Sequence, residues 1–198
     1  MTAKARPTPL PREHLDVLDS ATGLFARALA DPLECDVAAC PGWSRRELAN
    51  HVLGGGLRYA AYFSRLPESE VEWTRTTDHA GDRPVPALYR TAAGLRKEFV
   101  RAPGADAIVR HRLAEMPVRD LLALRVIELV VHAHDLSPET WDSDEAEELA
   151  AWALGHGRDV VELMRTFDVF ADPLPVALGA DSRARLLALT GRSAPSES

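Results

Sequence analysis

The sequence has few cysteines, no long apolar run and no excess of basic residues, and each absence excludes a class of protein. The two cysteines, Cys35 and Cys40, are too few to cross-link 198 residues, so we expect reduced thiols and no disulfide framework. No run approaches the roughly 18 apolar residues of a membrane span, and the first residues lack the apolar core of a secretion signal. A formal net charge of −7 disfavours nucleic acid and anionic membranes as partners. We therefore expect a cytoplasmic protein that binds neither nucleic acid nor membranes.

The composition and length are those of one globular unit. Hydrophobic residues make up 46% of the chain and charged residues 27%, close to the globular average. A chain of 198 residues is expected to form a single domain over 1–198. Its core is expected over about 9–168, with a C-terminal extension over about 169–192.

Apolar residues recur at helical spacing through most of the chain. The polar residues 67–81 indicate a loop, and 105–116 could form a short strand or an irregular crossover. The pattern predicts an all-α bundle, with helices over about 10–30, 44–66, 85–101, 117–136, 143–166 and 182–190.

The second predicted helix has a marked start and an unusual middle. Ser44 followed by Glu47 forms a capping box, which satisfies backbone N–H groups at a helix start. Glycines at 54, 55 and 56 cost about 1 kcal/mol each relative to alanine in a helix. Either the helix kinks or ends there, or close helix packing or a pocket against the backbone compensates.

The helix predicted over 117–136 is apolar on most sides, so it should be central, and its polar residues are the informative ones. Glu128 and His132 are four residues apart, which places both side chains on one helix face, where they could bind one metal ion. Arg125 and Asp135 continue the stripe three residues to either side and could orient the ligands or bind an anionic substrate.

A third metal-ligand candidate is His51, which lies beside the glycine run. It follows Glu47 at the same acid-x-x-x-His spacing, but the capping box already accounts for Glu47. Two histidines and one carboxylate from two helices would leave positions open for water and substrate. The spacing alone leaves a structural alternative open, namely an Arg125–Glu128 salt bridge and histidines with satisfied hydrogen bonds.

Two segments together resemble a known family. CPGWSRRELANHVLGG (40–55) and RVIELVVHAHDL (125–136) resemble the DinB/YfiT-like superfamily, and most closely the actinobacterial metal-binding proteins related to the N-terminal domain of mycothiol-dependent maleylpyruvate isomerase. The similarity extends through GDRPVPALYRTAAGLRKEF (81–99) and ARLLALTGR (184–192), so it covers nearly the whole chain.

The resemblance implies a DinB-like four-helix bundle that holds a divalent metal on His51, Glu128 and His132. Zn is the expected ion, with Ni, Fe or Mn as alternatives, and mycothiol is the implied cosubstrate. The implied function is a thiol-dependent transferase or isomerase acting on a small molecule, with Arg125 and Asp135 as catalytic candidates and a homodimer as a possible assembly. The alternatives are a hydrolase or lyase that uses metal-bound water, a non-catalytic metal- or ligand-binding bundle, and a purely structural network.

The sequence departs from the family pattern at two points. His134 stands where such sequences usually carry an aromatic residue, and it lies on the opposite side of the helix from His132, so we do not expect it to join the same metal. The isomerase itself carries a further C-terminal domain, whereas this chain is expected to have only a short tail. We therefore do not expect maleylpyruvate isomerisation itself.

The remaining candidates receive structural interpretations. Cys35 and Cys40 are interpreted as small loop or buried residues, and His79 and His111 as surface residues in loops. The acidic run over 142–148 is interpreted as a helix start, where acids favour the positive end of the helix dipole. Core positions are expected for the four tryptophans, Trp43, Trp73, Trp141 and Trp152.

Overall fold

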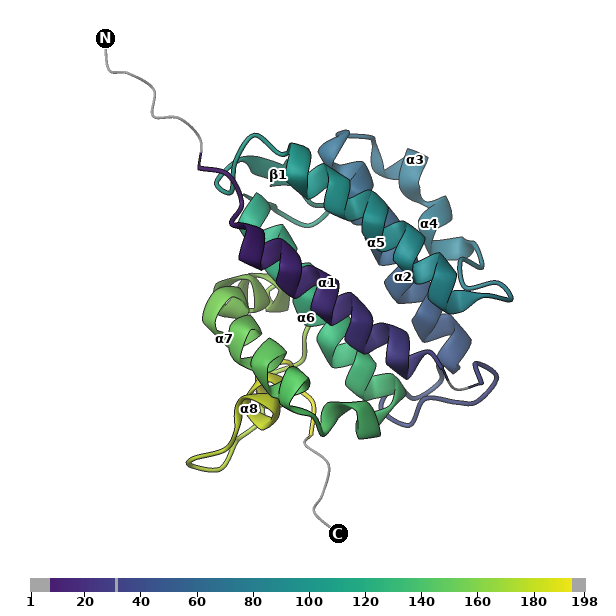
Figure 1. Cartoon of the computed structure of the whole chain (residues 1–198), viewed down its shortest axis with the longest axis vertical. Coiled ribbons are helices and arrows are strands. Elements are labelled where there is room, and N and C mark those ends of the chain that lie inside the picture. Colours follow the sequence, from purple (N-terminus) through teal and green to yellow (C-terminus); the bar gives the residue numbers. More distant parts are fainter. Residues whose placement is uncertain (1–7, 31, 194–198) are drawn as a thin grey trace.

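The structure is a computed structural model that describes residues 8–30 and 32–193. Its centre is a bundle of α1 (Arg12–Ala28), α2 (Arg45–Phe63), α5 (Pro84–Arg101) and α6 (Val118–Leu136). Helix α6 packs against α1 and α2, and α5 packs against the same two helices. Figure 1 shows α2 and α5 on one side of α1 and α6, and α7 (Asp144–Arg165) and α8 (Ser182–Leu189) on the other. The predicted all-α class is confirmed.

One connection differs from the prediction, and another decides between two alternatives that the sequence left open. Residues 67–81, expected to be a loop, contain the one-turn helices α3 (Glu68–Val71) and α4 (Trp73–Thr76). The ambiguous segment forms a hairpin of β1 (Ile108–Arg110) and β2 (Glu115–Pro117), in which Val109 pairs with Met116. The hairpin packs against α2 and α6. A short 3-10 helix, η1 (Pro138–Trp141), links α6 to α7.

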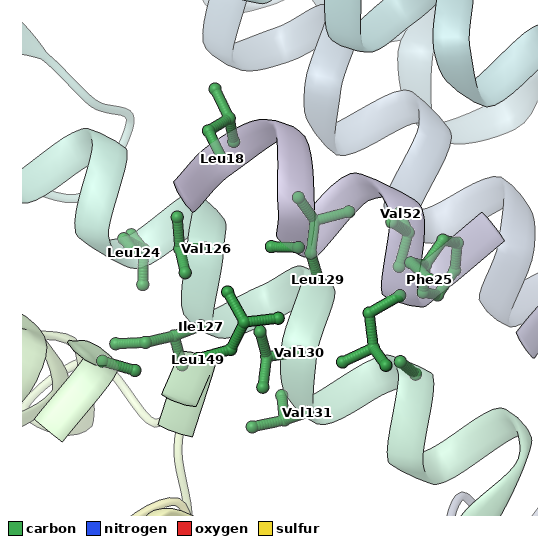
Figure 2. Close-up of a cluster of buried hydrophobic side chains, with 14 of the residues drawn as sticks. Leu18, Phe25, Val52, Leu124, Val126, Ile127, Leu129, Val130, Val131 and Leu149 are labelled. Atoms are coloured by element: carbon green, nitrogen blue, oxygen red, sulfur yellow. The ribbon is translucent and has the colours of Figure 1, made fainter. Parts of the chain in front are cut away.

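Helix α6 is the centre of the hydrophobic core, as its apolar sequence predicts. Its side chains meet α1 through Leu18 and Phe25, α2 through Val52 and α7 through Leu149 (Figure 2). Full burial of each such side chain contributes about 1.5–3 kcal/mol to folding. The core residues drawn from α6 are Leu124, Val126, Ile127, Leu129, Val130 and Val131, each 0 or 1% exposed.

Helix α2 begins at the predicted capping box and continues without interruption through the glycine run. A methyl group at Gly54 would overlap the backbone oxygen of Thr74 in α4. Methyl groups at Gly55 and Gly56 would lie 3.1 and 3.2 Å from the guanidinium nitrogens of Arg125. The glycines therefore admit a neighbouring backbone and a buried arginine, and this close packing offsets their poor helix propensity.

Two of the four tryptophans are not core residues. Trp141 is buried, whereas Trp43 and Trp73 are 38% and 52% exposed. Both cysteines are free thiols, with Cys35 exposed and Cys40 half-buried. Among the described helices, none is long and apolar enough to cross a membrane.

Candidate functional site

A cavity of about 350 Å³ lies between α2, α6 and the hairpin, and all three predicted metal ligands line it. His51 reaches it from α2, and Glu128 and His132 reach it from adjacent turns of α6. A second cavity of about 520 Å³ shares part of this lining, including His51 and Arg58. The bundle therefore brings residues 51, 128 and 132 to one internal surface.

His51 contacts two aromatic rings at this surface. Its ring centroid lies 5.3 Å from that of His132 and 5.5 Å from that of Trp43, with both pairs edge to face. Burial is the main cause that lowers the pKa of His51, to about 4, and the neighbouring His132 adds to the shift. The imidazole is thus neutral near neutral pH. Within residues 8–30 and 32–193, neither of its ring nitrogens makes a hydrogen bond.

Glu128 is held by one donor on each carboxylate oxygen. The hydroxyl of Tyr59 donates to Oε1 at 3.0 Å, and Nη1 of Arg125 donates to Oε2 at 3.3 Å. Burial by itself would raise the pKa of Glu128, but the charge of Arg125 and the two site histidines outweigh burial and lower it. The side chain is therefore a carboxylate, oriented by α2 and by its own helix.

His132 is oriented by a buried carboxylate. Its Nδ1 lies 2.8 Å from Oδ2 of Asp135, which also accepts a hydrogen bond from Nη2 of Arg192 at 2.8 Å. Burial would raise the pKa of Asp135, but these bonds lower it far below its usual range. With Nδ1 bonded to a carboxylate, Nε2 is the ring nitrogen left to bind a ligand, and it has no hydrogen-bonding partner in the described chain. Metal-binding histidines are commonly oriented in this way.

The two catalytic candidates do not line the cavity. Arg125 is 1% exposed and reaches the site through Glu128, and Asp135 is 5% exposed and reaches it through His132. Both are therefore placed to position a neighbouring side chain. His134 is buried against Trp141, 5.3 Å between ring centroids, and lies outside the cavity lining, as its position on the helix predicts.

The interpretation of His111 as a surface residue is wrong. It is 7% exposed, lines the cavity and contacts the rings of Tyr62 and Tyr59 at 5.1 and 5.8 Å. Burial is the main cause that lowers the pKa of His111 to about 4. The alternation of Val109 inward, Arg110 outward and His111 inward was the signal available in the sequence.

Five further residues of the cavity wall were not selected from the sequence. Tyr59 and Arg58 come from α2, Cys40 precedes that helix, and Arg112 follows the first strand of the hairpin. Arg192 comes from the segment after α8. Over the part of the chain that the structure describes, no group of three or more His, Cys, Asp or Glu side chains is already gathered tightly enough to hold a metal ion.

Comparisons with known proteins agree on one relationship. Residues 15–137 match the family model of the mycothiol maleylpyruvate isomerase N-terminal domain. Two uncharacterized proteins of Mycobacterium tuberculosis, Rv0738 of strain H37Rv and MT0763 of strain CDC 1551, are each 27% identical over 186 residues, which cover 91% of this chain and 96% of theirs.

The fold also matches a solved structure. The crystal structure of the mycothiol-dependent maleylpyruvate isomerase aligns with a TM-score of 0.62 and 16% identity, over 94% of this chain and 91% of that chain. The match is consistent with the expected DinB-like bundle. The alignment covers 91% of the isomerase chain in that structure, whereas we expected the isomerase to have a further domain without a counterpart in this chain.

Proposed function

The chain belongs to the mycothiol maleylpyruvate isomerase N-terminal domain family, and we propose that it is a divalent-metal-dependent enzyme that uses a low-molecular-weight thiol on a small electrophilic substrate. The family name points to mycothiol as the thiol and to isomerisation, or a related transfer, as the reaction. The proposed ligands are His51, Glu128 and His132. Zn is the expected ion, with Ni, Fe or Mn as alternatives.

The observation that carries this proposal is the set of unpaired imidazole nitrogens in the cavity wall. Both ring nitrogens of His51 and Nε2 of His132 lack hydrogen-bonding partners in the described chain. These nitrogens are not among the fully buried unpaired atoms of the described residues, so a ligand in the cavity can reach them. Two imidazoles and one carboxylate are also a donor set that Zn and similar ions accept. The residues therefore fit a metal ion.

Neighbouring residues orient these ligand atoms. Asp135 fixes the tautomer of His132, so that Nε2 presents its lone pair, and such a partner raises the basicity of a ligand. Arg125 and Tyr59 keep Glu128 ionised and oriented. When bound, a divalent ion would supply the charge that keeps a coordinated thiol in the thiolate form near neutral pH. The cavity provides space for a small substrate beside that position.

Elemental analysis of purified protein tests the metal site. We expect near-stoichiometric metal in the wild type and none in His51→Ala or His132→Ala. His156→Ala is the matched control, because His156 is exposed on α7 and lies outside the cavity lining. Wild-type protein that stays metal-free after reconstitution with Zn, Ni, Fe(II) and Mn would contradict the proposal.

Turnover of a panel of small electrophiles with and without mycothiol tests the thiol. We expect turnover that requires both the thiol and the metal, and that is lost in His132→Ala with helicity retained. Turnover that needs the metal but no thiol would assign the site to metal-bound water, as in a hydrolase or lyase. Stoichiometric metal without any turnover would indicate a binding protein.

One alternative has its own support in the structure. The Arg125–Glu128 pair and the His132–Asp135–Arg192 chain together form a buried polar network between α6 and its neighbours. Such a network can position helices without any ligand. It predicts a metal-free protein and leaves His51 unexplained, because His51 takes no part in these bonds.

A further inference from the structure

The chain between α7 and α8 exposes apolar side chains that the rest of the molecule does not cover. Residues 167–178, named here the apolar segment, extend beyond the helices beside α8 (Figure 1). Exposed apolar surface of this kind usually marks an interaction site. The side chains that are 40–107% exposed are Phe167, Val169, Leu174, Val176 and Leu178. We propose that this segment, together with α8, forms a dimer interface with a second copy of the chain.

The apolar segment is exposed but held in place. It forms neither helix nor strand. The backbone N–H of Leu174 donates to the carbonyl oxygen of Ala188 in α8 at 2.9 Å, and Nε of Arg165 in α7 donates to the carbonyl oxygen of Ala171 at 3.0 Å. Because both flanking helices fix the segment, a partner meets a surface that is already shaped, and binding orders little additional chain.

The same surface carries a protruding side chain and a cavity. Leu178 is fully exposed, and a cavity of about 310 Å³ lies beside it. The cavity is lined by residues 174–177 of the apolar segment and by Ala184 and Ala188 of α8, whose small side chains leave it open. Two copies related by a two-fold axis use the same surface, so Leu178 of each copy can enter the cavity of the other. This self-complementary shape favours a second copy over an unrelated partner.

Two charges of opposite sign flank the cavity. Asp172 lies two positions before the lining residue Leu174, and Arg185 directly follows the lining residue Ala184. Asp172 and Arg185 are both exposed, and neither forms an ion pair within the described chain. In a two-fold dimer, Asp172 of one copy can pair with Arg185 of the other, and the reverse pair forms at the same time. The surface therefore complements itself in charge as well as in shape.

The exposed apolar area suits a weak dimer. The five side chains together equal nearly three fully exposed ones. Burial of each full side chain removes about 100 Å² from water, which gives about 300 Å² per copy. A standard interface buries about 800 Å² per partner, slightly more than half of it non-polar. The segment therefore supplies most of the apolar area of such an interface, and its exposed residues Pro173, Pro175 and Ala177 add to it.

The interface borders the candidate metal site. Arg192 lines both the 310 Å³ cavity and the cavity that contains the three proposed ligands. Val169 of the apolar segment also lines the cavity of the proposed ligands. A second copy would therefore cover the surface next to Arg192, whose guanidinium holds Asp135. The inference goes beyond the proposed function, because it assigns a partner and requires neither metal nor thiol.

Sedimentation velocity of the full chain tests the interface. We expect a monomer–dimer equilibrium with a dissociation constant of about 10 μM, measured from about 1 to 200 μM protein. Leu178→Asp should raise this constant at least about tenfold, because a carboxylate would enter the apolar cavity. The variant should keep the helicity and urea stability of the wild type, because Leu178 is fully exposed in the single chain.

Val100→Asp is the matched control. Val100 is 58% exposed on α5, which lies on the opposite side of the bundle from α8 (Figure 1). This variant should form dimers as the wild type does. Wild-type protein that stays monomeric at about 200 μM, or dimers of Leu178→Asp as tight as those of Val100→Asp, would overturn the proposal.

Charge reversal tests the two-fold arrangement. Asp172→Arg and Arg185→Asp should each weaken the dimer about tenfold, because each places two pairs of like charges across the interface. An equimolar mixture of the two variants should recover dimers, because both opposite-charge pairs form again in the mixed dimer. A mixture that associates no better than either variant alone would overturn the two-fold interface. None of these measurements reads metal or turnover, so a monomeric protein would contradict this inference and leave the proposed function intact.

Discussion

Asp135→Asn is the substitution that most directly tests how the site is oriented. The carboxylate accepts hydrogen bonds from His132 and from Arg192, each at 2.8 Å, and it is almost completely buried. Asparagine preserves the shape but removes the charge, and its amide can donate to Nδ1 of His132 and select the wrong tautomer. We therefore expect two separate losses, one of metal affinity and one of stability.

Their magnitudes follow from the bonds that change. Loss of a carboxylate partner of a metal-binding histidine typically lowers metal affinity about 10- to 100-fold, so we expect a loss in this range for Asp135→Asn. Loss of a hydrogen bond to a charged group costs about 1.5–3 kcal/mol of folding free energy. Metal affinity is measured by competition with a chelator, and stability by urea unfolding of the metal-free proteins, because bound metal would itself stabilise the folded state.

Arg192→Gln is the matched variant. It breaks the same ion pair with Asp135 but leaves the bond between Asp135 and His132 in place. We expect it to lose stability comparably and to keep a metal affinity close to that of the wild type. If Asp135→Asn loses stability but binds metal as tightly as Arg192→Gln, then Asp135 has only a structural role and the reasoning about His132 is refuted.

Two further predictions concern packing and pH. Gly54→Ala should lower the free energy of unfolding by about 1–2 kcal/mol, because overlap with the Thr74 carbonyl outweighs the gain in helix propensity. Gly94→Ala, where a methyl group meets open space, should raise the free energy of unfolding by about 0.5–1 kcal/mol. Equal changes in the free energy of unfolding for the two variants, measured by urea titration, would contradict this reasoning. Because the pKa of His111 is about 4 when folded and about 6.5 when unfolded, the unfolded chain binds the extra proton. The contribution of His111 to stability should therefore fall by up to about 3 kcal/mol between pH 6.5 and pH 4. His51, whose pKa is also lowered to about 4, should add a loss of the same sign, so His111→Gln should show a shallower slope in the same titration.

The elements that local signals determine were predictable from the sequence. The capping box of Ser44 and Glu47 predicts the start of α2, and the structure has both of its hydrogen bonds. The spacing of Glu128 and His132, together with the resemblance, selected side chains that line one cavity with His51. The roles of these three as metal ligands stay predictions.

The contacts that depend on distant parts of the chain were not predictable. Tyr59 reaches Glu128 across 69 residues, and Arg192 reaches Asp135 across 57, so no local pattern could pair them. His111 was interpreted as a surface residue because it was expected in a loop, where histidines are usually exposed. Its burial follows from the packing of the hairpin on α2, which only the tertiary structure shows.

The packing of Gly55 and Gly56 against the guanidinium of Arg125 has a consequence for the evolution of this fold. The arginine occupies the space that side chains at 55 and 56 would need, so none of the three positions can change freely on its own. A relative that replaces Arg125 with a smaller residue would leave a void, which larger residues at 55 or 56 could fill. We therefore expect the three positions to covary among relatives, and variants with single changes at these positions to be rarer than variants with compensating pairs.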